Sequence, residues 1–443
     1  MSALPTRIEA QAGRSLSPSE IFKISASREA GLSRLLTLYI STGLVFMLLP
    51  GTFLGVWNLL SISSHRTLSA VSNAWIQAHG HAQIYGWIGT FILGIGFYSL
   101  PKLRRMDPLA LSTGLITWGL WTSGVSLRWL AGVYEWHWRA ALPLSAALEL
   151  AAFLIFLRAV SAHRPQDSGK DRLEEWVIVV MAGTVGLLLT LVVNLASVLS
   201  LAIYGKSPEL PHSFDQRFLV LQTWGFLVPF VWGFSAKWMP VFLGLRPTRG
   251  RALLSAVALN SAGTLAALQG WIGIAVFLLL GGMSFAVYAL RLFEPTDRPA
   301  KTRGVHASFP VFVRLAYAWG IVSALLAIWA AYSGNPPGIW GASRHGLTVG
   351  FLAMMVFAVG QRVLPAFSGM HLLFSSKLMF VALLVLSVGC LLRVGSEILA
   401  YGGLVSSAWS WLPISAYAEM TAITVYALNL SITFARRPQV VPA

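Results

Sequence analysis

The segment His81-Ala-Gln-Ile-Tyr-Gly86-Trp87 returns later in the chain as His345-Gly-Leu-Thr-Val-Gly350-Phe351. In both segments a Gly-aromatic pair follows the histidine by five residues, and a proline, Pro101 or Pro365, follows it by 20. Twenty residues of α-helix rise about 30 Å, which is the thickness of the hydrocarbon core of a bilayer. Each segment therefore predicts a membrane-spanning helix with its histidine near one face and its proline near the other.

The sequence that follows these segments repeats as well. Gly124-Val-Ser-Leu-Arg128 recurs as Gly389-Cys-Leu-Leu-Arg393, and Leu142-Pro-Leu-Ser-Ala-Ala-Leu-Glu149 as Leu412-Pro-Ile-Ser-Ala-Tyr-Ala-Glu419. A third copy of the frame, Val220-Leu-Gln-Thr-Trp-Gly225-Phe226, has valine in place of the histidine. Three ordered matches indicate internal duplication. We expect three parallel repeats of four helices, over about 35–165, 170–295 and 305–434.

Composition supports an all-α polytopic membrane protein. Of 443 residues, 56% are hydrophobic and only 11% charged, whereas a soluble domain is about a quarter charged. About 12 spans are expected within one transmembrane domain over 35–434, with tails at 1–34 and 435–443. The expected spans are 35–57, 80–100, 110–130, 141–160, 176–201, 218–241, 252–269, 271–291, 312–332, 344–364, 376–397 and 411–434.

The net charge of +16 reports topology and does not indicate a nucleic-acid partner. Alternating sides along the expected spans place 25 of the 32 Lys and Arg residues on the side of the termini and 7 on the other. Under the positive-inside rule both termini are then cytoplasmic. The single cysteine, Cys390, excludes a disulfide framework, and the amino-terminal region lacks the short apolar core of a cleaved signal peptide.

Histidine ligands on separate helices can hold a haem between them, and His81 and His345 match in frame and depth. The alternative is a pair of interfacial histidines that hydrogen-bond across the bundle. His79 lies about 200° around the helix from His81, so one regular helix cannot aim both at one metal. His79 is therefore an alternative ligand or belongs to another site. Three further outer histidines are candidates for a copper site or are simply solvated: His65, His137 and His212.

Four charged residues are expected to form duplicated pairs inside the membrane. An intramembrane carboxylate usually faces the bundle interior and has a partner, which predicts the pairs Arg128–Glu149 and Arg393–Glu419. These pairs fix helix packing, or they serve a proton path. Arg344, beside His345, is a candidate partner for a haem propionate or an ordinary interfacial arginine.

With these motifs the chain resembles the NnrS family, bacterial membrane haem-copper proteins associated with nitric oxide stress, within the haem-copper oxidase subunit I superfamily. The matching residues are His79-Gly-His81 with Gly86 and Pro101, Leu127-Arg128, and His345 through Gly360-Gln-Arg362 to Pro365. The resemblance implies a subunit I-like fold in the bacterial cytoplasmic membrane. It also implies haem b between the second and tenth helices, with copper as a second candidate, and a role in nitric oxide response or detoxification.

The departures from the oxidase pattern limit the chemistry. The sixth span lacks a His-Pro-Glu-Val-Tyr-like element, the seventh lacks a His-His pair, and the tenth has one histidine instead of His-x-His. The resemblance therefore implies one haem site and no complete oxygen-reducing centre, and it leaves open whether the protein catalyses a reaction. Two alternatives remain: a cofactor-free proton- or cation-coupled transporter, and an assembly protein of a respiratory complex.

Overall fold

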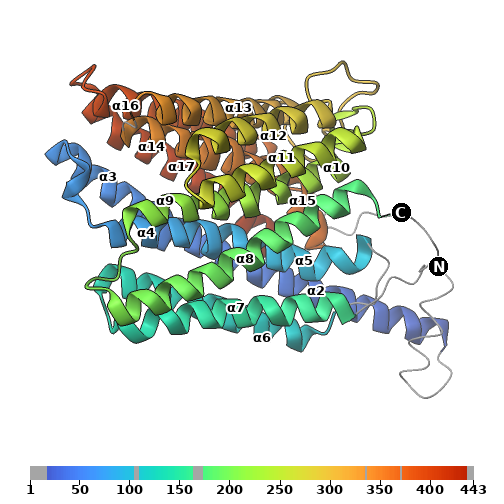
Figure 1. Ribbon diagram of the computed structural model, residues 1–443. Helices are drawn as coiled ribbons and strands as arrows, with labels where there is room; N and C mark the ends of the chain where they lie inside the picture. The colour runs from blue at the N-terminus through green and yellow to red at the C-terminus, as the bar shows by residue number, and fades with distance from the viewer. Residues whose placement is uncertain (1–16, 104–108, 163–172, 335–336, 370–371, 437–443) are drawn as a thin grey trace.

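The computed structural model describes residues 17–103, 109–162, 173–334, 337–369 and 372–436, and every regular element in them is helical. Figure 1 shows the helices running side by side as one bundle. In chain order they are α2 (Pro18–Phe46), η1 (Met47–Phe53), α3 (Leu54–His65), η2 (Leu68–Ala70), α4 (Asn73–His81), η3 (Ala82–Gly89), α5 (Thr90–Leu103), α6 (Leu111–Tyr134), α7 (Trp138–Ala162), α8 (Glu175–Tyr204), α9 (His212–Val220), η4 (Leu221–Leu227), α10 (Val228–Leu243), α11 (Gly250–Leu268), α12 (Ile272–Leu290), α13 (Phe309–Tyr332), α14 (Pro337–His345), η5 (Gly346–Ala353), α15 (Met354–Phe367), α16 (Ser376–Tyr401) and α17 (Ala408–Ala435).

Ten of the continuous helical segments in the described residues are long and apolar enough to cross a membrane. Two more, α6 and α17, have 24 and 28 residues but fall outside these ten. Only helices and closed barrels satisfy all their backbone hydrogen bonds inside a bilayer. The predicted all-α polytopic fold is confirmed, and α11 and α12 are separated at Gln269–Trp271, as expected from the sequence.

The second helix of each repeat contains a π-helical segment at the same place in its sequence frame. The π-helical segments η3, η4 and η5 begin directly after His81, Val220 and His345. A π-helical turn contains one extra residue, turns the side chains that follow it, and leaves a carbonyl group without its usual partner. Side chains from adjacent helices bind such carbonyl oxygens: Trp121 Nε1 donates to Tyr85 O in η3, and Asn260 Nδ2 to Trp224 O in η4.

The glycine repeated in this frame allows the helices to approach closely. A Cβ atom at Gly86 would lie 2.9 Å from Phe46, and one at Gly350 would lie 2.5 Å from Trp319. In the middle copy the close contact lies on the other side, where a Cβ atom at Gly186 of α8 would lie 1.9 Å from the Gly225 carbonyl oxygen. Small residues at such crossings let helix backbones pack closely inside a membrane.

The histidine-bearing helices begin earlier than the sequence suggested. The expected spans start at 80 and 344, but α4 begins at Asn73 and α14 at Pro337. The added turns include polar residues, such as Gln77, which exchanges two hydrogen bonds with the Leu210 backbone. At 1.5 Å per residue, His81 and His345 therefore lie about 12 Å inside their helix starts and not at the helix ends.

Candidate functional site

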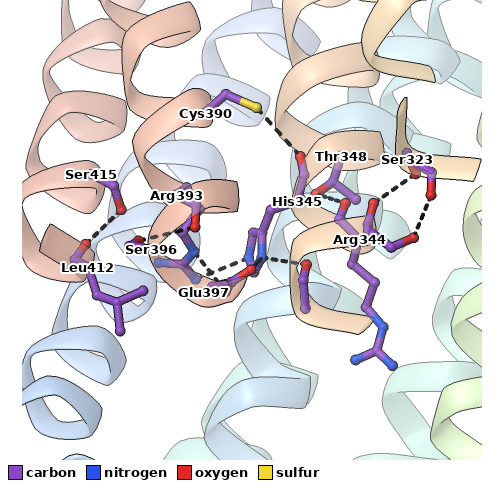
Figure 2. Close-up of polar contacts among 12 residues, drawn as sticks. Ser323, Arg344, His345, Thr348, Cys390, Arg393, Ser396, Glu397, Leu412 and Ser415 are labelled. Atoms are coloured by element: carbon purple, nitrogen blue, oxygen red, sulfur yellow. Dashed lines mark hydrogen bonds and ion pairs between the residues drawn. The ribbon is translucent and has the colours of Figure 1, made fainter. Parts of the chain in front are cut away.

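The imidazole of His345 is held on both sides by polar groups of α14 and α16 (Figure 2). Its Nδ1 atom lies 3.0 Å from the Gly341 carbonyl oxygen and 3.0 Å from Glu397 Oε2. Its Nε2 atom lies 3.1 Å from Arg393 Nη2, and Arg393 Nε also donates to Glu397 Oε1 over 3.0 Å. The carboxylate of Glu397 thus connects the imidazole to the guanidinium.

These contacts determine which nitrogen of His345 carries the proton. A guanidinium only donates hydrogen bonds, so Nε2 must present its lone pair to Arg393. The Gly341 carbonyl oxygen only accepts, so Nδ1 carries the hydrogen. A neutral imidazole with Nδ1–H bonded to a carbonyl or carboxylate and Nε2 free of hydrogen is the form that ligates a metal.

His79 has the same arrangement on α4, and the backbone of η1 creates it. Pro50 lies inside this π-helical segment, and the Pro50 and Gly51 carbonyl oxygens accept hydrogen bonds from side chains of other helices. Trp129 Nε1 donates to Pro50 O, and His79 Nδ1 donates to Gly51 O over 2.8 Å. The Nε2 atom of His79 has no hydrogen bond within the described residues, and the imidazole interacts electrostatically with His345 and Arg393.

His81 faces a different set of helices. Its Nε2 atom lies 2.8 Å from Glu149 Oε1 of α7, and its ring stacks on Tyr85 with centroids 4.3 Å apart. The His81 side chain is 6% exposed and that of Glu149 is fully buried. Since the carboxylate occupies Nε2, His81 acts in this structure as one half of a buried imidazole–carboxylate pair that joins α4 to α7.

Glu149 and Glu419, the carboxylates at matching positions of the first and third repeats, differ from the expectation in their direct contacts. We expected the pairs Arg128–Glu149 and Arg393–Glu419. The charges of each pair interact electrostatically, but the direct contact of Glu149 is with His81 and that of Arg393 is with Glu397. The reason is local: Arg393 and Glu397 are one helical turn apart on α16, where side chains lie on the same face. Among the described residues Glu419 has an oxygen without a hydrogen-bond partner.

Glu397 is a site residue that the sequence interpretation missed. The span was expected to end at 397, so this carboxylate was placed at a membrane surface, yet α16 continues to Tyr401 and Glu397 is 3% exposed. Its i,i+4 spacing from Arg393 on one helix was the available signal. The duplication gave none, because the equivalent residue four after Arg128 is Gly132.

Arg344 is half-buried, and its guanidinium points away from the His345 imidazole (Figure 2). It interacts electrostatically with Glu397 and with Asp215 of α9, and Asp215 in turn interacts with Arg128. Asp215 thus brings the middle repeat into the charged region. Three arginines, Arg128, Arg344 and Arg393, thus lie at the same end of the bundle as His79, His81 and His345.

Several buried polar atoms at this end lack hydrogen-bond partners in the part of the chain that is described. They include the cationic Nη1 atoms of Arg128 and Arg393, and Glu149 Oε2. Buried polar groups are normally hydrogen-bonded, so each such atom requires an explanation. A bound anionic group, such as a haem propionate, would satisfy the arginine atoms.

No group of three or more His, Cys, Asp or Glu side chains suited to a metal ion occurs among the described residues. The three outer histidines lie on separate elements. His65 ends α3 and its Nδ1 atom lies 2.9 Å from Ser61 O, His137 has a φ of 42° between α6 and α7, and His212 is the first residue of α9.

Comparison with solved structures supports the fold. The chain is similar to a chain described as part of a heme-copper terminal oxidase dimer, with a TM-score of 0.67 and 10% identity, covering 92% of this chain and 84% of the other. No protein-family model and no curated protein matches the sequence. The fold is that of haem-copper oxidase subunit I, and the protein is a multi-pass membrane protein of that architecture.

Proposed function

We propose that this protein is a haem-binding membrane protein in which His79 and His345 are the axial ligands. The observation that carries the proposal is the shared state of these histidines. Each has its Nδ1–H anchored on a backbone carbonyl, at Gly51 or Gly341. The Nε2 atom of His345 accepts from Arg393, and that of His79 has no hydrogen bond within the described residues. Sequence spacing alone favoured His81 as the partner of His345, whereas the Glu149 contact at His81 Nε2 favours His79.

The charged groups around the two imidazoles fit a haem. Arg393 has an unpartnered Nη1 atom and donates from Nη2 to His345 Nε2, so ligation at His345 requires its guanidinium to turn towards a propionate. Arg344 is a second candidate for a propionate. A haem bound here would be held by His79 and His345 and would supply one-electron redox chemistry.

The physiological role that we propose is response to, or detoxification of, nitric oxide at the bacterial cytoplasmic membrane, with both termini cytoplasmic. The support is the resemblance of the His79-Gly-His81 and His345 segments to the NnrS family. Haem b is the proposed cofactor, and copper is a second candidate. The absence of histidine from Val220 to Pro240 supports a role other than complete oxygen reduction.

The test is the pyridine haemochrome spectrum of protein purified from haem-replete cells. We expect a b-type spectrum with about one haem per chain. Colourless protein after haem-replete expression and haem reconstitution would contradict the proposal. Addition of nitric oxide to the reduced protein should shift the Soret band, and an unchanged spectrum would reject nitric oxide as a ligand.

One observation favours a second candidate, a proton- or cation-coupled transporter. The His81–Glu149 pair is buried, bridges two helices and has a free carboxylate oxygen, as intramembrane proton-carrying groups often do. This candidate predicts pH-driven uptake into proteoliposomes that is lost in Glu149→Gln. Retained uptake in that variant would exclude Glu149 as the coupling group.

A further inference from the structure

A cavity of about 120 Å³ lies on the central axis of the bundle, between α5, α10 and α15. These are the second helices of the three repeats, and each packs chiefly on neighbours other than the two helices across the axis: α5 on α2, α10 on α8, and α15 on α13 and α16. The space between them is lined by apolar side chains, among them Ile92, Ile95, Val231, Phe234, Val356 and Val359.

The lining of this axial cavity excludes ordered water. The polar groups of its lining side chains are the hydroxyl of Ser235, which is only 2% exposed, and the indole N–H of Trp238. A buried water molecule needs two to four polar partners, and cavities lined by Leu, Ile and Phe stay dry. The axial cavity is therefore an apolar site between the three helices that is partly open at its edge.

The axial cavity is bordered by aromatic side chains at one end and extends towards the histidines at the other. At the end away from the histidines, Phe367 contacts Tyr98 and Trp238 with ring centroids 5.0 and 6.3 Å apart, which joins α15 to both other helices. At the other end the lining includes Ile88 and Leu352. Leu352 lies seven residues after His345, and Ile88 lies nine residues after His79, which is about 10 and 14 Å along their helices.

The volume of the cavity selects the class of ligand. A dry cavity of about 150 Å³ takes up benzene or a xenon atom, so a volume of about 120 Å³ suits a molecule of a few heavy atoms. We propose that the axial cavity binds a small, neutral, apolar molecule of the size of a dissolved diatomic gas. That this gas is nitric oxide on its way to the histidines rests on the proposed function.

Xenon under pressure is the probe for the cavity. We expect anomalous density in crystals of the full-length protein between Ile92, Val231 and Val356. Val359→Phe, which adds a ring to the lining, should abolish that density. Leu391→Phe is the matched control, because Leu391 is 63% exposed on the outer surface of α16, and it should leave the density unchanged. A second filling variant, Ile92→Phe, serves if Val359→Phe does not fold.

The outcomes separate this proposal from the haem proposal. Absence of xenon from the wild-type cavity, or continuous density of an acyl chain or detergent tail in it, would overturn the cavity proposal. Xenon in the cavity of protein that shows no haemochrome would support the cavity and contradict the haem site. If both are present, Val359→Phe should slow nitric oxide binding at least several-fold in stopped-flow measurements while leaving the haem spectrum unchanged, and an unchanged rate would refute the link between cavity and haem.

Discussion

Two histidines that are two residues apart have opposite roles in this structure. His79 donates from Nδ1 to a backbone carbonyl and keeps Nε2 free, whereas His81 uses Nε2 to bind Glu149. The difference follows from helix geometry, because a separation of about 200° sends the two rings towards different neighbours. His79 reaches η1 and the His345 side of the bundle, and His81 reaches α7.

At the residue scale, the His81–Glu149 pair should stabilise the fold without ligating a cofactor. Glu149→Ala leaves a buried imidazole without its partner and should cost about 3–5 kcal/mol, as for other buried pairs that lose one member. Glu149→Gln retains an oxygen that accepts from Nε2 and should cost much less. The measurement is thermal unfolding in detergent, followed by tryptophan fluorescence, and equal losses in the two variants would contradict this assignment.

At the element scale, the position of His79 depends on α3 as well as on η1. A Cβ atom at Gly55 would lie 2.7 Å from the Cε1 atom of His79, so Gly55→Ala should push the imidazole away from the Gly51 carbonyl. We expect this variant to bind haem at least several-fold more weakly by titration. Gly119→Ala is the control, since a Cβ atom there meets nothing within 4 Å. Equal affinity in the two variants would show that α3 does not position His79.

The helical elements could be predicted from the sequence, but their internal geometry could not. Hydropathy and the His81/His345 frame predicted the order of the helices, because residues that face lipid are apolar. About twelve spans were expected, and ten helical segments of the described residues are long and apolar enough to span a membrane. The π-helical segments left no sequence signal beyond the repeated glycines, since a π-turn depends on packing against neighbouring helices. The sequence therefore favoured His81 over His79 as the partner of His345, since it gave no information on the Glu149 contact at His81 Nε2.

The contacts of the charged residues, like the internal geometry of the helices, could not be predicted from the sequence. Arg128, Glu149, Arg393 and Glu419 were expected from the sequence to be buried charges. Arg128, Glu149 and Arg393 are 5%, 0% and 8% exposed, whereas Glu419 is only half-buried. Their direct contacts depend on which way each side chain leaves its helix, and repeat symmetry did not predict them. The two copies differ at the position four residues after the arginine, which is Gly132 in one and Glu397 in the other, and Glu397 forms the ion pair with Arg393.

At the scale of the whole molecule, the charge distribution predicts the orientation in the membrane. Ser69 lies in the connection at the histidine end of the bundle, and Lys301 lies in the connection between α12 and α13 at the other end. In a Cys390→Ala background, Ser69→Cys should react with a membrane-impermeant maleimide added outside spheroplasts. Lys301→Cys should react only after the cells are opened. The reverse pattern would show that the termini lie outside.

The first and third repeats each supply a histidine whose Nδ1 donates to a backbone carbonyl, His79 and His345. The middle repeat supplies Asp215 to the same region. The central claim is that His79 and His345 are the axial ligands of one haem. Electron paramagnetic resonance of the ferric protein tests it most directly. We predict a low-spin bis-imidazole signal that becomes high-spin in His79→Ala and in His345→Ala, returns on addition of imidazole, and persists in His81→Ala. Loss of the low-spin signal in His81→Ala with retention in His79→Ala would contradict the account.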